Sequence, residues 1–195
     1  MTTTPTPAAT VTAPAQLPLR VLSVGRWPAP GDPAGLPLPA LPGFTASSFN
    51  PLVAETAERC LHAHRGADPT PSRTALLLVS AGGDRATALA IDTLSAADRR
   101  MPPLLFFQSN PNAVLGHIAA RRHLTGPVVA VSPTTTPAPG EIPADAWELA
   151  DLLLLDGDAD QVLVIVAEQA DPSEQPHHGD RAIAVLVAPA PAAPA

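Results

Sequence analysis

The chain of 195 residues contains no lysine, no tyrosine and a single cysteine, Cys60. One cysteine cannot form a disulfide within the chain, so a disulfide-stapled scaffold is excluded. All eleven basic residues are arginine, and with alanine and proline so abundant this is typical of a GC-rich genome rather than of a function. The formal net charge of −7 gives little attraction to nucleic acid or anionic lipid, and we expect neither as a partner.

Long apolar runs and several common motifs are also missing. The longest apolar runs, such as Val162–Ala167, are too short to cross a bilayer. Residues 1–16 lack the basic start and apolar core of a secretion signal, so we expect a soluble cytoplasmic protein. The glycine-rich nucleotide-binding motifs and the G-x-S-x-G motif of α/β-hydrolases are absent, and neither activity is expected.

Proline, in contrast, is abundant. Of the 26 prolines, 17 cluster in residues 5–18, 28–42, 133–143 and 189–194. Proline removes a backbone donor and fixes φ, so these clusters predict loops and tails. We expect a disordered tail over residues 1–18, one domain over 19–187 and a second tail over 188–195.

Apolar patterns between these clusters predict the secondary structure. Continuous or alternating apolar runs indicate strands, and apolar residues three or four apart indicate helices. The expected strands are Leu19–Trp27, Ala75–Ser80, Val128–Val131, Gln161–Ala167 and Arg181–Val187. The expected helices are one capped by Asn50 with Pro51 at its first position, then Arg85–Leu94, Asn112–His123 and Asp145–Leu155. The order β-α-β-α-α-β-α-β-β predicts an α/β fold, with a mostly parallel five-stranded sheet, helices on both faces and an antiparallel last strand at one side.

Four short motifs occur within this order of elements. They are Pro111-Asn112-Ala113, Gly116-His117-Ile118-Ala119, Leu124-Thr125-Gly126-Pro127 and Gly157-Asp158-Ala159-Asp160. In sequence and spacing they resemble the N-terminal half of the β-ketoacyl synthases of the thiolase-like superfamily. The resemblance covers about residues 20–187 and implies one of the two similar halves of that fold. It also implies a nucleophilic cysteine at the start of a buried helix after Val128–Val131, completed by histidine or asparagine residues from the second half.

The expected nucleophile is not there. The resemblance places it near Thr135, between Pro133 and Pro137, and prolines disfavour a helix start. A threonine hydroxyl without an adjacent base is a poor nucleophile. Cys60 lies on the apolar face of the first helix, where we expect it to pack as a small hydrophobe. The sequence therefore predicts no condensing activity.

A further group of residues consists of candidates for an acyl pocket or a subunit interface. These are Phe106, Phe107, Asn112, His117 and Val129. Core packing is the default interpretation for the two phenylalanines, and a structural hydrogen bond is the default for His117.

No metal or other cofactor is expected. His62 and His64 are two apart on a helix and point to different sides, and His177-His178 lacks further ligands at a suitable spacing. Asp156, Asp158 and Asp160 are better interpreted as a helix-to-strand turn than as a calcium loop. Gly82-Gly83 before a helix offers amides to an anion, but no phosphate motif accompanies it.

Two functions of different classes follow from the resemblance. The preferred one is a non-catalytic ketosynthase-like subunit of bacterial fatty-acid or type II polyketide assembly. It would associate with itself, a ketosynthase or an acyl carrier protein, because half a fold leaves an apolar helical face exposed. The alternative is an enzyme that processes acyl thioesters (an acyltransferase, dehydratase or thioesterase) with His117, Thr135 or Glu168. A degenerate fragment without a task is a third possibility.

Overall fold

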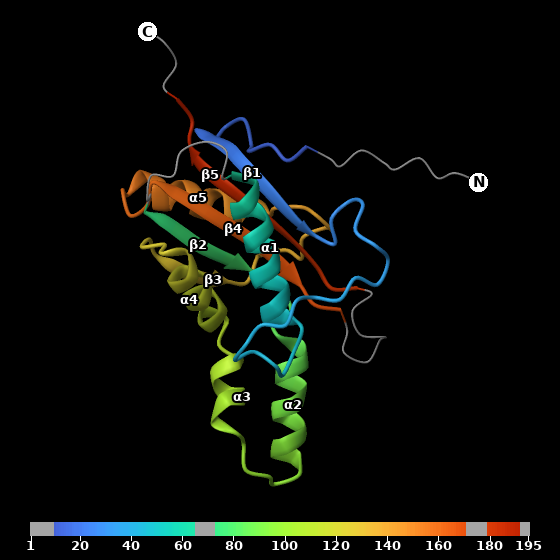
Figure 1. Ribbon diagram of the computed structural model, residues 1–195. Coiled ribbons are helices and arrows are strands. Elements are labelled where there is room, and N and C mark those ends of the chain that lie inside the picture. The colour runs from blue at the N-terminus through green and yellow to red at the C-terminus, as the bar shows by residue number, and fades with distance from the viewer. Residues whose placement is uncertain (1–9, 65–72, 171–178, 192–195) are drawn as a thin grey trace, which may run out of the picture.

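The chain builds a five-stranded sheet flanked by helices, which the computed structural model describes over residues 10–64, 73–170 and 179–191 (Figure 1). The strands are β1 (Leu19–Trp27), β2 (Thr74–Val79), β3 (Val128–Val131), β4 (Gln161–Glu168) and β5 (Arg181–Pro189). The helices are α1 (Phe49–His64), α2 (Arg85–Ala96), α3 (Pro103–Gln108), α4 (Pro111–Arg122) and α5 (Ala144–Leu155). Each predicted strand and helix is present, and α3 is an additional helix that the apolar pattern did not predict.

The strands lie in the order β1-β5-β4-β2-β3. Strand β2 pairs in parallel with β3 and β4, whereas β5 pairs antiparallel with both β4 and β1. The predicted sheet with an antiparallel last strand is therefore confirmed. The last two strands, β4 and β5, pair antiparallel as predicted, and β1 pairs along the other edge of β5, so that strand lies inside the sheet. Strand β3 is left at an edge.

Helices cover both faces of the sheet, as predicted. Strand side chains alternate between the faces, so β2 and β4 contribute to two separate apolar clusters. Helices α1 and α4 pack on one face, where Leu52, Cys60 and Leu115 are fully buried. Helix α5 packs on the other face through Trp147 and Ala150. No helix in the described part of the chain is long and apolar enough to cross a membrane.

The first described residues run beside the end of the chain. Val11 and Leu17 pack against the α5 face of the core, and the Ala190 amide donates to the Pro18 carbonyl at 2.7 Å. These residues belong to the segment expected as an N-terminal tail, of which residues 1–9 lie outside the described part. The bounds of the domain and its tails stay predictions.

Helix α1 begins earlier than predicted. Its first residue is Phe49, whose amide donates to Ser47 Oγ at 3.0 Å. Asn50 is not the cap: it is buried inside the first turn and its amide group donates to Asp84 Oδ2 and to the Gln108 carbonyl. The cap prediction was wrong because this side chain makes tertiary contacts, which local sequence does not reveal.

Helices α2 and α3 project from the body as an arm (Figure 1). We call residues 85–108 the α2–α3 arm. Within its two helices only Thr87 and Gln108 are buried. Hydrogen bonds hold its base: the Asp84 side chain caps α2, and Gln108 Oε1 accepts from the amides of Thr45 and Ala46 at 3.1 and 3.0 Å. The base of the arm is therefore attached by these polar contacts and by a ring contact of Phe107 with the core residue Phe44, whose centroids lie 6.2 Å apart.

Candidate functional site

The candidate site lies at the carboxyl ends of β2 and β3, where neighbouring parallel strands bring their following turns together. A cavity of about 240 Å³ opens there between Ser80–Gly83 and Ser132, with Phe49 and Pro111 in its wall. The resemblance to β-ketoacyl synthases places the nucleophile next to this position.

The segment after β3 is a loop rather than a helix start. No helix begins until Ala144, and Thr135 is exposed. Along this loop the Thr134 amide donates to Asp145 Oδ2 at 2.8 Å. A helix N-terminus would supply free amides and a positive dipole end, both of which favour a thiolate or an oxyanion. Neither is available at Thr135.

Glu168, at the end of β4, holds the turn that follows β2. Its carboxylate accepts hydrogen bonds from the amides of Ala81 at 2.6 Å and Gly82 at 3.2 Å. These amides belong to the glycine turn considered above as an anion receptor, so a side chain of the protein already takes that role. Glu168 is thereby fixed as a structural acceptor.

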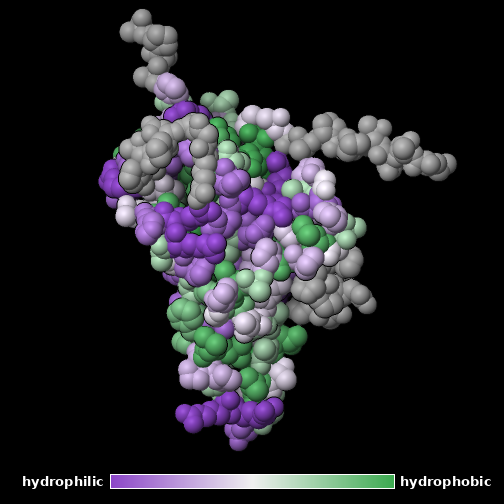
Figure 2. Space-filling model, in the orientation of Figure 1, coloured by the Kyte–Doolittle hydropathy of each residue, from purple (hydrophilic) through white to green (hydrophobic). Residues whose placement is uncertain are grey.

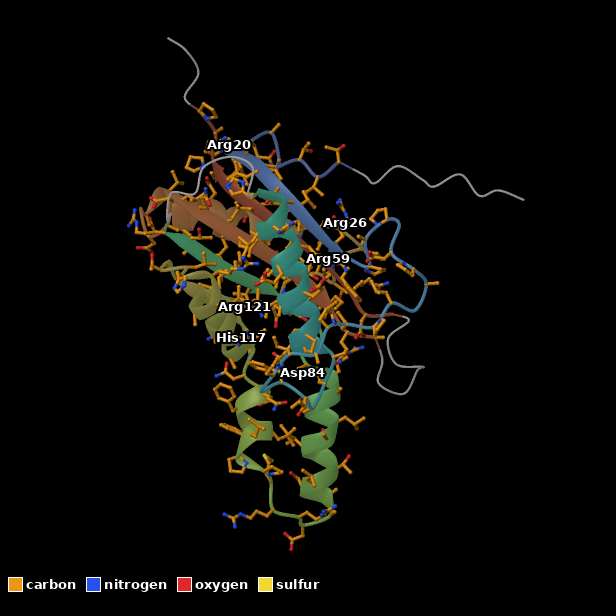
Figure 3. The ribbon with its side chains drawn as sticks, in the orientation of Figure 1. Arg20, Arg26, Arg59, Asp84, His117 and Arg121 are labelled. Atoms are coloured by element: carbon orange, nitrogen blue, oxygen red, sulfur yellow. The ribbon has the colours of Figure 1, made fainter. Side chains whose placement is uncertain are left out.

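His117 lies on α4 (Figure 3), and its ring contacts that of Phe44. The two rings meet edge to face at 81°, with centroids 5.8 Å apart. Its Nε2 atom is buried without a hydrogen-bond partner among the described residues, so the expected structural hydrogen bond is replaced by a ring contact. His117 lines one cavity, with Glu58 and Arg121, and Glu168 lines another. The structure does not bring the proposed base and carboxylate together.

Cys60 packs inside the protein, as expected. Its side chain is fully buried between α1 and β1, 3.4 Å from Ser23 Oγ. Burial raises the pKa of the thiol to about 11, a shift that the hydrogen bond to Ser23 only partly offsets. A protonated thiol is a poor nucleophile. The one cysteine is therefore unsuited to covalent catalysis.

The α2–α3 arm carries an apolar surface. Its members are Leu89, Leu104, Phe106 and Phe107, each more than half exposed, and we call them the apolar arm surface. Figure 2 shows hydrophobic side chains gathered over this arm. Phe106 is 71% exposed, so the default interpretation of the phenylalanines as core residues was wrong.

The two other candidates lie nearby in sequence but differ in setting. Asn112 is exposed in the first turn of α4, where its backbone amide donates to the capping Asn110. Val129 is half-buried on the edge strand β3. Neither side chain reaches a group that would make it catalytic.

No protein-family model matches the sequence, and no curated protein does either. Solved structures do match. A ketosynthase in complex with its chain length factor from Xenorhabdus doucetiae matches with a TM-score of 0.60 and 18% identity, over 89% of this chain and 80% of that chain. The ishigamide ketosynthase/chain length factor matches with a TM-score of 0.63 and 18% identity, over 82% of this chain and 49% of that chain. A β-ketoacyl synthase from Burkholderia phymatum matches with a TM-score of 0.62 and 13% identity, over 89% of this chain and 59% of that chain.

The fold is that of the ketosynthases and chain length factors. The observed α/β unit corresponds to one thiolase-like half, as the motifs predicted. The chain spans about half the length of two of these relatives, but 80% of the matched chain from Xenorhabdus doucetiae. In this fold a loop follows β3, at the position where the resemblance places the nucleophile.

Proposed function

We propose that this protein is a non-catalytic ketosynthase-like subunit that associates with a ketosynthase in bacterial fatty-acid or type II polyketide assembly. One observation carries the proposal. The ketosynthase fold is present, yet the segment from Ser132 to Pro143, where the resemblance expects the nucleophile helix to start, is a loop that is exposed around Thr135.

The chemistry of the described residues supports the absence of condensing activity. Condensation through a covalent intermediate needs a nucleophile with a base or a lowered pKa. Thr135 is exposed on a loop, and the pKa of the buried Cys60 thiol is raised to about 11. His117 and Glu168 line separate cavities. None of these four candidates therefore forms a nucleophile–base pair in the described structure.

The comparisons support a ketosynthase as the partner. Two of the matched structures are described as a ketosynthase with its chain length factor. In the first of them the matched chain is covered to 80%, so that chain is not much longer than this one. A short subunit with this fold is compatible with such a complex.

The apolar arm surface is the contact that we propose for the partner. Burying a large apolar side chain stabilises a complex by about 1.5–3 kcal/mol relative to leaving it exposed. Phe106 and Phe107 are 71% and 55% exposed, so most of that gain is still available to a partner. Strand β3, which includes Val129, lies at an edge of the sheet and contacts α4. We include this open edge in the proposed interface.

Co-purification with a ketosynthase encoded next to this gene tests the association. We expect a stable complex by size-exclusion chromatography with light scattering. The double variant Phe106→Ser/Phe107→Ser should weaken it at least tenfold, since two anchors are lost. The matched control is Leu152→Ser/Leu155→Ser, because these leucines are 51% and 70% exposed on α5. A monomeric protein that captures no ketosynthase would contradict the proposal.

Mass spectrometry of acyl carrier protein thioesters tests the missing activity. The purified chain should leave acyl and malonyl thioesters unchanged, and Thr135→Ala should not alter the turnover of its complex with a ketosynthase. Turnover by the chain alone that disappears in His117→Ala would instead favour the acyl-thioester enzyme.

A further inference from the structure

A large cavity lies apart from the candidate site. Its volume is about 710 Å³, and it is bounded by the loop before α1 and by residues next to β4 and β5. Most of its wall is apolar, including Leu38, Leu41, Phe44 and Pro51. Cavities of roughly 300–1,000 Å³ with apolar walls and a few polar groups are typical small-molecule sites.

A buried polar network forms one side of this cavity. Gln169 Nε2 donates to Ser47 Oγ at 3.2 Å and to Ser48 Oγ at 2.8 Å, while its Oε1 accepts from the Ala86 amide at 3.0 Å. The Ser48 hydroxyl donates to Asp180 Oδ2. These bonds fix Gln169 and Asp180, which are 8% and 5% exposed.

The buried Asp180 carboxylate is held by neutral donors among the described residues. It accepts from the Ser48 hydroxyl and from the Ala170 amide, and an ionised carboxylate has about four acceptor positions. No cation of the described residues lies within ion-pairing distance of it. The N-terminus of α1 adds a partial charge of only about +0.5. A buried charge of this kind favours a cationic partner.

We propose that this cavity binds an amphipathic cation, with an apolar body against Leu41 and Phe44 and a primary ammonium group against Asp180. The apolar walls contact the body of the ligand, and the negative charge of the Asp180 carboxylate selects a positively charged head group. An alkyl carboxylate of the same length is disfavoured because two negative charges would meet in a buried site. The cavity touches the arm at Ala86 and through the contact of Phe44 with Phe107, but the proposed ligand does not depend on the ketosynthase partner.

Isothermal titration of the full chain with n-octylammonium chloride tests the site. We expect saturable binding that weakens about tenfold or more in Asp180→Asn, since the charged hydrogen bond is lost. Ala46→Trp, which fills the cavity from an exposed position of its wall, should weaken binding at least as much. The control Asp98→Asn removes the same charge from the exposed tip of the arm and should leave binding unchanged.

Sodium octanoate is the second probe and should not bind. Equal binding of octanoate, unchanged octylammonium binding in Ala46→Trp, or no saturable binding at millimolar octylammonium would each overturn the proposal. Thermal unfolding of every variant shows whether it is folded. If Asp180→Asn does not fold, the effect of Ala46→Trp on octylammonium binding tests the proposal.

Discussion

At the scale of single residues, Cys60 shows how composition and burial combine. The thiol is fully buried, which raises its pKa to about 11. Because the chain has no lysine and no tyrosine, no other type of side chain in it ordinarily titrates between pH 9 and 11. The pH dependence of stability in that window therefore reports on Cys60.

We expect the free energy of unfolding to fall as pH rises from 9 to 11. In the unfolded chain the thiol ionises near pH 8.5–9, whereas in the folded protein it stays protonated up to about pH 11. The unfolded state therefore binds fewer protons in this window, and the decline is on the order of 2–3 kcal/mol. Urea unfolding at pH 8, 9.5 and 11 measures it. In Cys60→Ala the decline should disappear, and an equally steep decline there would contradict the assignment.

Single residues also mark the limit of what the sequence predicts. The burial of Cys60 followed from its spacing on an amphipathic helix. Core packing, the default interpretation for Phe106 and Phe107, was wrong, because an apolar pair shows a preference for burial but not whether a partner is available within the same chain. The place of Thr135 followed from the motifs and prolines around it, whereas the separation of His117 from Glu168 required the three-dimensional structure.

At the scale of elements, two glycines of the family-like motifs have different roles. A Cβ atom at Gly126 would lie 2.5 Å from the Ala75 amide nitrogen, which is backbone and cannot rotate away. At Gly116, within α4, a Cβ atom would meet nothing within 4 Å. Only Gly126 is required for the close approach of the segment leading into β3 to the start of β2.

Gly126→Ala should destabilise the protein by about 2 kcal/mol or more, because the two segments must separate. Gly116→Ala is the matched control and should be neutral or stabilise the protein by up to about 1 kcal/mol through helix propensity. Denaturant unfolding of both variants measures the difference. Equal effects of the two substitutions would show that the close approach at Gly126 is not needed.

The elements themselves were largely predictable, and the exceptions have physical causes. Buried strands such as β2 are continuous apolar runs between turn signals, so their positions follow from the sequence. Helix α3 has 6 residues, too few to show helical periodicity, and was missed. The inside position of β5 depends on its pairing with β1, which no local pattern encodes.

At the scale of the whole molecule, the sheet joins segments that precede the arm in the sequence to segments that follow it. Strands β1 and β2 precede the arm, and β3, β4 and β5 follow it. The pairings of β1 with β5 and of β2 with β4 and β3 all cross this division. The large cavity has the same origin: loops far apart in sequence form it, so no motif could predict it.

Cleavage at the tip of the arm should therefore leave the protein folded. Trypsin can cut after Arg99 or Arg100, which are exposed between α2 and α3. We expect the two fragments to elute together in size-exclusion chromatography and to keep the far-ultraviolet circular dichroism of the intact chain. Arg99→Gln/Arg100→Gln should abolish this cut. Separation of the fragments under native conditions would mean that the sheet does not hold them.

The position of β5 between β1 and β4 also sets an order on the ribosome. Strand β1 is synthesised first of the five, but among the described strands it pairs only with β5, which begins at Arg181. Until translation reaches that point, β1 has no strand to pair with, and β4 has an unpaired side as well. Nascent chains that stall before Arg181 expose two open strand edges, which favour association with other chains. Completion of the sheet therefore waits until translation has passed β5.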